Sequence, residues 1–245
     1  MLPRAAVQRD YRTRSSAIER VGRPRFFARN MQIYRETEPA NYVYKLISGT
    51  VRTYRTLIDG RRQIAAFYLP GDFLGLERGE EHVFSAEAVT DVRLLVIDRS
   101  AMVSRAKWDN DIARQLWTLM RRELQIAQDH AGLLIKTAPE RVASFLLEMA
   151  DRIQSRDEVE LPMSRQDIAD FLGLTIETVS RTLTQLENAS VIALPCSKRI
   201  VLRNRSSLKR LVEGGCKPVS GMDKGGYTHR QSKALALNGS AAALA

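Results

Sequence analysis

Two hydrophobic periods divide the chain. From about residue 32 to residue 97, short runs rich in Val, Ile, Tyr and Thr alternate with polar positions and are separated by turn pairs such as Asp59-Gly60. Strands joined by tight turns have this pattern. From about residue 107 the apolar residues recur every three or four positions, which is the period of a helix. The pattern therefore predicts an all-β segment followed by helices.

The all-β segment contains six or more short runs. The Asp59-Gly60 pair predicts a hairpin whose second strand covers residues 63–69. Residues 84–89 and 92–97 flank Thr90-Asp91 and predict a second hairpin. Short strands at this spacing favour a small sandwich or a rolled barrel.

A long helix is expected over residues 107–137. Its apolar residues follow a near-heptad spacing and form one narrow stripe, made of Ala113, Leu116, Met120, Leu124, Ala127, Ala131 and Leu134. A stripe this narrow favours pairing of two copies of the helix, and packing on the chain's own β segment is the alternative. A second helix is expected over residues 141–153.

Residues 161–202 predict a winged helix-turn-helix. Ser164 and Asp167 have the spacing of an N-cap and its third helical position, for a helix over 165–172. Gly173 suits a sharp exit because glycine accepts a positive φ at low cost. Thr175 then caps a second helix, from residue 176 to about residue 188. Residues 191–194 and 199–202 predict a β-hairpin that forms the wing.

The polar face of the second helix carries groups that match base edges. Arg181 offers a planar fork that fits guanine, Glu177 can accept from cytosine, and Ser180 can contact a base or a phosphate. An ordinary ion pair between Glu177 and Arg181, one turn apart, is the alternative and is compatible with base reading. Phosphate contacts are expected at the helix starts and on the wing, from Ser164, Arg165, Thr175, Thr178, Lys198 and Arg199.

The nineteen residues 163–181, MSRQDIADFLGLTIETVSR, resemble the signature of the Crp/Fnr transcription regulators. Their Glu-x-x-Ser-Arg core is similar to the Fnr-type reading head, and the chain most resembles the FixK-like branch. The resemblance implies an α+β fold with a cyclic-nucleotide-binding-like β-roll, a long dimerisation helix and a C-terminal winged helix-turn-helix. It also implies a homodimer that binds double-stranded DNA at a TTGA-N6-TCAA-like palindrome. RNA polymerase is the further partner that it implies, in the activation of microaerobic, anaerobic or nitrogen-fixation genes.

Five segments follow from these patterns: a basic arm (1–30), the β-roll (31–106), the dimerisation helix (107–137), the DNA-binding domain (138–213) and a tail of disordered composition (214–245). The formal net charge is +10, and its excess lies mostly at the two ends. Basic terminal segments of this kind favour binding to a polyanion, but they do not indicate which polyanion. The terminal Ala243-Leu244-Ala245 is similar to a tag that bacterial proteases read.

The resemblance raises two sensor chemistries that the residues do not match. Cyclic-nucleotide members hold the phosphate with an Arg-Ser pair, whereas Phe84 precedes Ser85 here and the nearby acids Glu80, Glu81 and Glu87 would repel a phosphate. The [4Fe–4S] cluster of Fnr needs four thiolates, and residues 1–195 contain no cysteine. We expect no cofactor; a small ligand, or haem on His82 or His130, is the alternative.

The remaining observations exclude classes of protein. No metal-spaced cluster, nucleophile elbow or phosphate-binding glycine loop is present, so an enzyme is not expected. No run approaches the ~18 apolar residues of a membrane span, and no secretory signal is seen. Two cysteines, Cys196 and Cys216, fit a reducing cytoplasm. Oxidation of Cys196, in the wing turn, would place negative charge near the DNA backbone and act as a redox brake; an incidental thiol is the alternative.

Overall fold

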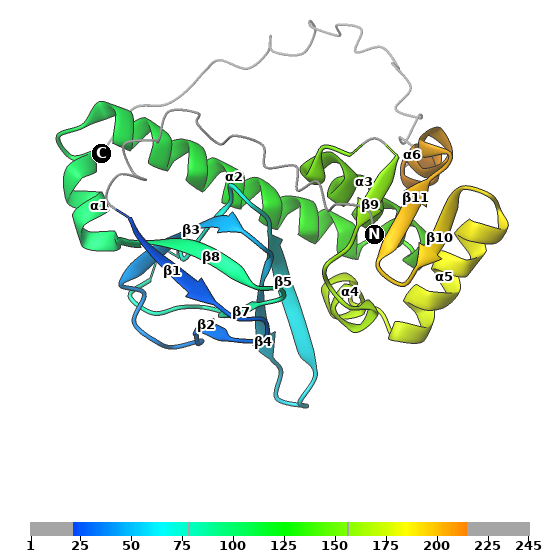
Figure 1. Ribbon diagram of the computed structural model, residues 1–245, viewed down its shortest axis with the longest axis horizontal. Coiled ribbons are helices and arrows are strands. Elements are labelled where there is room, and N and C mark those ends of the chain that lie inside the picture. The colour runs from blue at the N-terminus through cyan, green and yellow to red at the C-terminus, as the bar shows by residue number, and fades with distance from the viewer. Residues whose placement is uncertain (1–21, 78, 156, 215–245) are drawn as a thin grey trace, which may run out of the picture. The chain divides into compact units, whose positions relative to one another are not determined.

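The computed structural model describes residues 22–77, 79–155 and 157–214, and Figure 1 shows the order of their elements. Most of the basic arm and the tail from residue 215, with Cys216 and the terminal Ala-Leu-Ala, lie outside the described residues. Among the residues described, no helix combines the length and the apolar character that crossing a membrane requires.

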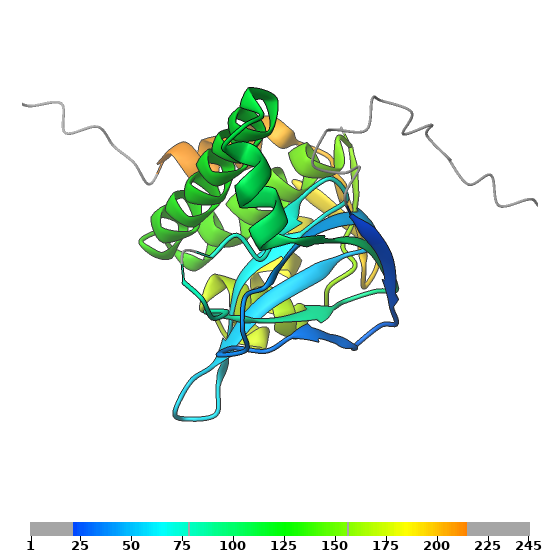
Figure 2. The same ribbon diagram turned by 90° about the vertical axis from the view of Figure 1, so that its left-hand side faces the viewer.

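The N-terminal part is a β-roll of two four-stranded sheets. One sheet has the order β1-β8-β3-β6 and the other the order β2-β7-β4-β5. Their strands are β1 (Arg23–Phe27), β2 (Gln32–Tyr34), β3 (Tyr42–Ser48), β4 (Val51–Thr56), β5 (Arg62–Tyr68), β6 (Phe73–Leu74), β7 (Ser85–Ala88) and β8 (Val92–Asp98). The buried apolar side chains of both sheets meet between them, among them Leu46, Val51 and Leu94. The predicted hairpin at Asp59-Gly60 joins β4 to β5 and extends from the roll in Figure 2.

The first strand corrects the expected boundary of the basic arm. Residues 23–27 form β1 and pair antiparallel with β8, so the β-roll begins before residue 31. Only Phe27 of this strand is buried. An edge strand keeps polar side chains in solvent, which protects the edge but removes the hydrophobic alternation that a sequence pattern needs.

The second predicted hairpin is wrong, because β7 and β8 lie in different sheets. β7 pairs with β2 and β4, whereas β8 pairs with β1 and β3. The short Thr90-Asp91 connection therefore turns a corner between the sheets. This corner keeps the buried positions of both strands, such as Ala88 and Leu94, in the one shared core.

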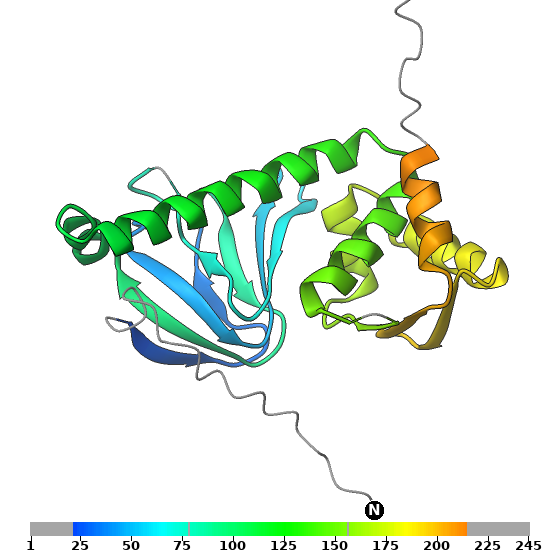
Figure 3. The same cartoon turned by 90° about the horizontal axis from the view of Figure 1, so that it is seen from above.

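Two helices follow the roll, α1 (Arg99–Ala106) and the long α2 (Asn110–Leu134). The side chain of Asp98 caps α1, and that of Asp109 caps α2. The long helix lies along the β-roll in Figure 3. Ile112 packs there in a cluster with Phe73, and Leu116 and Leu119 pack against this cluster.

The C-terminal part is a winged helix-turn-helix. It contains α3 (Ala138–Ile153), β9 (Glu158–Glu160), α4 (Arg165–Leu172), α5 (Ile176–Asn188), β10 (Ile192–Cys196), β11 (Arg199–Leu202) and α6 (Arg205–Gly214). The three strands form one sheet in the order β10-β11-β9. The ranges predicted for α4 and α5 are confirmed. Strand β9 and helix α6 were not predicted.

Candidate nucleic-acid interface

Local hydrogen bonds fix the turn between α4 and α5. The Ser164 hydroxyl accepts from the backbone N–H of Asp167, and the Asp167 carboxylate accepts from the backbone N–H of Ser164, which is the predicted capping box. Gly173 ends α4 with φ +62°, in the left-handed region. Thr175 then begins α5 by accepting from the backbone N–H of Thr178. The direction of α5 is thus set by residues close to it in the chain.

Helix α5 presents its polar face to solvent. Val179, Leu183 and Leu186 are buried in the main C-terminal core, while Ile176 is only partly buried. On the other side of the helix the three predicted base-reading side chains are exposed: Glu177, Ser180 and Arg181.

The two charged side chains on the exposed face of α5 do not pair with each other. In the described part of the chain no ion pair joins Glu177 to Arg181, so the guanidinium fork of Arg181 is not occupied by this carboxylate. A hydrogen bond from its own backbone N–H, with one from the Thr175 hydroxyl, lowers the pKa of Glu177 below its usual value. Glu177 is therefore a carboxylate, and hence an acceptor, at neutral pH.

The predicted phosphate contacts differ in their surroundings. Lys198 is exposed on the wing, and the Thr175 and Thr178 hydroxyl oxygens lie 3.1 Å apart at the start of α5. Arg199, in contrast, forms an ion pair with Glu158 of β9, which offsets its charge. The Ser164 hydroxyl donates to the Asp167 carboxylate, and Arg165 is partly buried, which lowers the pKa of its guanidinium. Among these residues Lys198 therefore presents an exposed charge, whereas the hydroxyls of Ser164, Thr175 and Thr178 already have partners within the chain.

A groove of about 1020 Å³ lies beside the N-terminus of α5. Thr175, Glu177 and Thr178 line one side of it, and Arg61 and Arg62 of the β4–β5 hairpin line it as well. The base-reading end of α5 therefore lies close to a basic segment of the β-roll.

The outer side of α2 carries an apolar stripe at heptad spacing. Met120 and Leu124 are 47% and 59% exposed, and Ala127, Ala131 and Leu134 are exposed as well. Leu116 does not belong to this stripe, because it packs against the cluster of Ile112 and Phe73. Trp117, 68% exposed, takes its place and was missed by the sequence pattern. A period near 3.5 fits either neighbour at this turn of the helix, so the sequence alone did not separate them.

The segment that corresponds to the phosphate-binding segment of cyclic-nucleotide members does not fit a cyclic phosphate. The Ser85 hydroxyl accepts from the backbone N–H of Glu36, so it is already engaged. Arg55, which stacks over Phe84, is ion-paired with Glu36. Inside the roll, the partly buried Glu77 has a buried Oε2 without a partner among the described residues. A carboxylate at this place repels a phosphate, so these residues do not match a cyclic nucleotide.

Both described histidines have structural surroundings. The two ring nitrogens of His130 lie 3.0 Å and 2.9 Å from the carbonyl oxygens of Ala65 and Phe171. The ring of His82 is buried, stacks on Tyr34 at 3.6 Å between centroids, and lies 3.3 Å from the Glu77 carboxylate. Both ring nitrogens of His130 therefore lie against backbone carbonyls, and the ring of His82 is packed against Tyr34. Among the described residues, no group of three or more His, Cys, Asp or Glu is placed to hold a metal ion.

Cys196 ends strand β10 at the wing turn, where the sequence placed it. Its side chain is exposed, and in the strand register it lies opposite Arg199. This position makes the thiol accessible to an oxidant in solution.

Comparisons with known proteins match both parts of the chain. Residues 24–106 match the family described as the cyclic nucleotide-binding domain, and residues 140–211 match the Crp-like helix-turn-helix domain. The first match begins within β1, in agreement with the corrected boundary of the β-roll.

The relatives and solved structures agree. The chain is 52% identical to the nitrogen fixation regulation protein FixK of Azorhizobium caulinodans, over 80% of this chain and 82% of that protein. It is 44% identical to the transcriptional activatory protein AadR of Rhodopseudomonas palustris, over 66% of this chain and 70% of that protein. The structure of FixK2 from Bradyrhizobium japonicum is 48% identical and superposes with a TM-score of 0.75, covering 78% of this chain and 97% of that one. The chain therefore belongs to the Crp/Fnr family of DNA-binding transcription regulators, in its FixK-like branch.

Proposed function

We propose that two copies of this chain bind a palindromic DNA site, with one α5 helix in each of two successive major grooves. The observation that carries the proposal is the exposed face of α5, where Arg181 is not paired with Glu177. Arg181 donates to guanine and Glu177 accepts from the cytosine paired with it. Ser180 lies on the same exposed face and adds a base or phosphate contact. Thr175, Thr178 and Lys198 contact phosphates.

The proposed dimer forms along α2. The exposed stripe of Trp117, Met120 and Leu124 supports it, because apolar side chains at heptad spacing are stable in a helix–helix seam and costly in solvent. A two-fold dimer presents two α5 helices to two half-sites about one helical turn apart. The palindrome of the resemblance, TTGA-N6-TCAA, has this form.

We further propose that the dimer acts in the cytoplasm as an activator that contacts RNA polymerase. Its target genes are those of nitrogen fixation or of microaerobic and anaerobic metabolism. The relatives named for nitrogen fixation regulation and for transcriptional activation support this role. DNA binding requires neither a cyclic nucleotide nor an iron–sulfur cluster. The engaged Ser85 hydroxyl and the partly buried Glu77 carboxylate support the first part, and the lack of cysteine in residues 1–195 supports the second.

A binding assay with purified chain tests this proposal. The probes are the palindrome, a scrambled palindrome of equal composition and a duplex with one half-site, each with and without cyclic AMP. We expect the palindrome to bind more tightly than its scrambled form by about 10³-fold or more at physiological salt, and more tightly than the single half-site, with no effect of cyclic AMP. Equal affinity for the palindrome and its scrambled form would contradict the proposal.

A further inference from the structure

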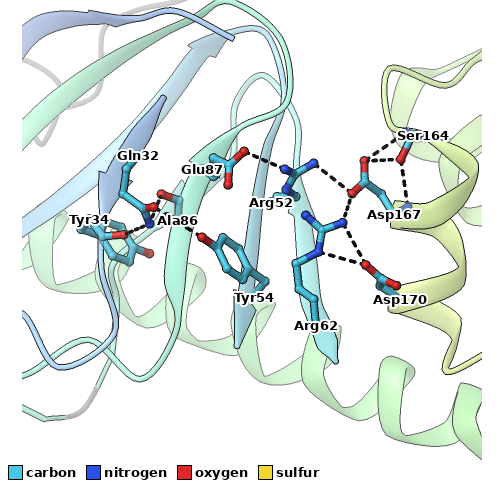
Figure 4. A network of polar contacts seen from close by, with 10 residues as sticks. All are labelled: Gln32, Tyr34, Arg52, Tyr54, Arg62, Ala86, Glu87, Ser164, Asp167 and Asp170. Carbon is cyan, nitrogen blue, oxygen red and sulfur yellow. Dashed lines mark hydrogen bonds and ion pairs between the residues drawn. The ribbon is translucent and has the colours of Figure 1, made fainter. Parts of the chain in front are cut away.

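One carboxylate joins the helix-turn-helix to the β-roll (Figure 4). The Oδ2 of Asp167 accepts from the backbone N–H and the hydroxyl of Ser164, at 3.0 Å and 2.8 Å, which closes the N-terminus of α4. Its Oδ1 accepts from Nη1 of Arg52 on β4 at 2.9 Å and from Nη2 of Arg62 on β5 at 2.5 Å. The group that caps α4 is thus also the group that holds it to the sheet.

The contact is a buried network rather than a surface ion pair. Arg52 also donates to Glu87 at 2.6 Å, and Nε of Arg62 donates to Asp170 of α4 at 2.9 Å. The side chain of Asp167 is only 4% exposed and that of Arg52 only 11%. Charges removed from water in this way are stable only while paired, so removal of one partner is strongly unfavourable.

The other end of α4 is also held by distant elements. The Phe171 carbonyl oxygen lies 2.9 Å from Nε2 of His130 on α2, and the Leu172 carbonyl accepts from Nη1 of Arg141 on α3 at 2.8 Å. Both carbonyls belong to the last turn of a helix, where no backbone partner is available within the helix. Helix α4 is therefore fixed at its start by the β-roll and at its end by α2 and α3.

The short connection between α2 and α3 does not by itself fix the orientation of the helix-turn-helix relative to the β-roll. Between α2 and α3 only residues 135–137 lie outside a helix. Arg152 of α3 forms an ion pair with Asp72 of the β-roll at 2.7 Å, which holds α3 to the same part. Arg52 of β4 and Arg62 of β5 hold the next helix, α4, to the β-roll, and α5 packs against α4.

We propose that Arg52 and Arg62 are positioning residues that set the distance between the two α5 helices of the dimer, and hence the spacing of the half-sites that it selects. The inference rests on the proposed function, since it needs a dimer on a palindrome. Because α2 forms the dimer seam and the β-roll packs on α2, a rigid link from β-roll to α4 places each α5 at a fixed distance from the two-fold axis. A dimer with fixed reading helices accepts one half-site spacing and rejects others.

The test compares Arg62→Gln with Arg55→Gln in the full chain. Arg55 lies on β4 of the same hairpin and pairs with Glu36 within the β-roll, so it is a control for the loss of an arginine ion pair. Four probes are used: the palindrome, the same half-sites with the spacer one base pair shorter or longer, and a single half-site. We expect Arg62→Gln to lose roughly fivefold or more of its discrimination between spacers, a typical coupling between distant sites. The affinity of Arg62→Gln for the single half-site, and the binding of Arg55→Gln to all four probes, remain those of the wild type.

A second variant separates positioning from folding. Arg62→Lys keeps a cation beside Asp167 and Asp170 and should retain most of the wild-type spacer discrimination. If Arg62→Gln keeps the wild-type ranking of spacers, or weakens all four probes equally, the positioning role is wrong. If the wild type bound the palindrome no more tightly than the single half-site, the proposed function itself would be wrong. Should Arg62→Gln fail to fold, Asp170→Asn, which removes one of the ion pairs of Arg62, is judged by the same ranking.

Discussion

The imidazole of His130 stacks on the ring of Phe171, with 4.4 Å between ring centroids, while its Nε2 lies 2.9 Å from the Phe171 carbonyl oxygen. Its Nδ1 lies 3.0 Å from the carbonyl oxygen of Ala65. In the β4–β5 register Thr53 pairs with Ala66 and Tyr54 with Ile64, so Ala65 sits at an irregularity between them. One side chain of α2 thus contacts a backbone carbonyl of β5, at a bulge, and another of α4.

The first prediction concerns this junction. His130→Phe keeps a stacked ring but leaves both carbonyls without the imidazole, so the free energy of unfolding should fall by about 2–4 kcal/mol. Urea denaturation measures it. Asp129→Asn changes an exposed neighbour and should stay within about 0.5 kcal/mol of the wild type. A loss in His130→Phe as small as that of the control would show that the two contacts contribute little.

Glu123 predicts a pH dependence of stability. Burial raises its pKa to about 7, although the Tyr68 hydroxyl donates to its Oε2 at 3.3 Å. An unfolded glutamate has a pKa of about 4.3, so the folded state holds the proton at higher pH. The stability from this group is complete below about pH 4.3 and is lost as the pH rises through about 7.

Glu123→Gln cannot lose a proton and should not show this loss. Relative to the wild type, the variant should gain about 1–3 kcal/mol of unfolding free energy at pH 8.5 and little at pH 5. Thermal or urea unfolding across this pH range measures the difference, with Glu213→Gln, an exposed position on α6, as control. Curves for wild type and Glu123→Gln that remain parallel would refute the role of this carboxyl.

The outer stripe of α2 predicts which substitutions separate the dimer. Met120→Glu and Leu124→Glu place charges in the proposed seam and should give folded monomers with much weaker DNA binding. Leu116→Glu, in contrast, faces the Ile112 and Phe73 cluster and should lower folding stability first. Sedimentation velocity together with thermal unfolding distinguishes these outcomes. A Leu124→Glu variant that sediments as the wild-type dimer would mean that the seam lies elsewhere.

Two basic residues should affect DNA binding in different ways. Arg181→Ala is expected to cost about 1–3 kcal/mol on the palindrome and to relax the choice of base at its guanine. Lys198→Ala should weaken binding uniformly across sequences and reduce the salt slope by about 1. Titrations on single-base variants of the site, at several salt concentrations, separate the two patterns. If Arg181→Ala retained full base discrimination, base reading would have to be assigned to another side chain.

The exposed thiol of Cys196 predicts a redox effect. Peroxide should weaken DNA binding of the wild type, because a negatively charged oxidised sulfur at the wing turn repels the DNA backbone. Cys196→Ser should bind equally well before and after the same treatment. The measurement is DNA affinity with and without peroxide. A Cys196→Ser variant as sensitive as the wild type would assign the effect to another residue.

Much of the DNA-reading unit could be predicted from the sequence because its determinants are local. The capping box of Ser164, the positive φ of Gly173 and the cap of Thr175 each act within a few residues of the helix end that they define. The apolar period of α5 then separates its buried face from the exposed side of Glu177 and Arg181. The β4–β5 hairpin could also be predicted from the sequence, since Asp59-Gly60 specifies its turn.

Only the tertiary structure decided how these units combine. The two strands beside Thr90-Asp91 have the same alternation whether they pair or turn a corner, and the position of the other strands selects the corner. Helix α2 has apolar residues on two sides, so packing on the β-roll determines that Leu116 faces inward and Trp117 outward. Arg52 and Asp167 meet across 115 positions of the chain. A local sequence pattern does not predict such contacts, because they form when buried charges from distant segments neutralise one another.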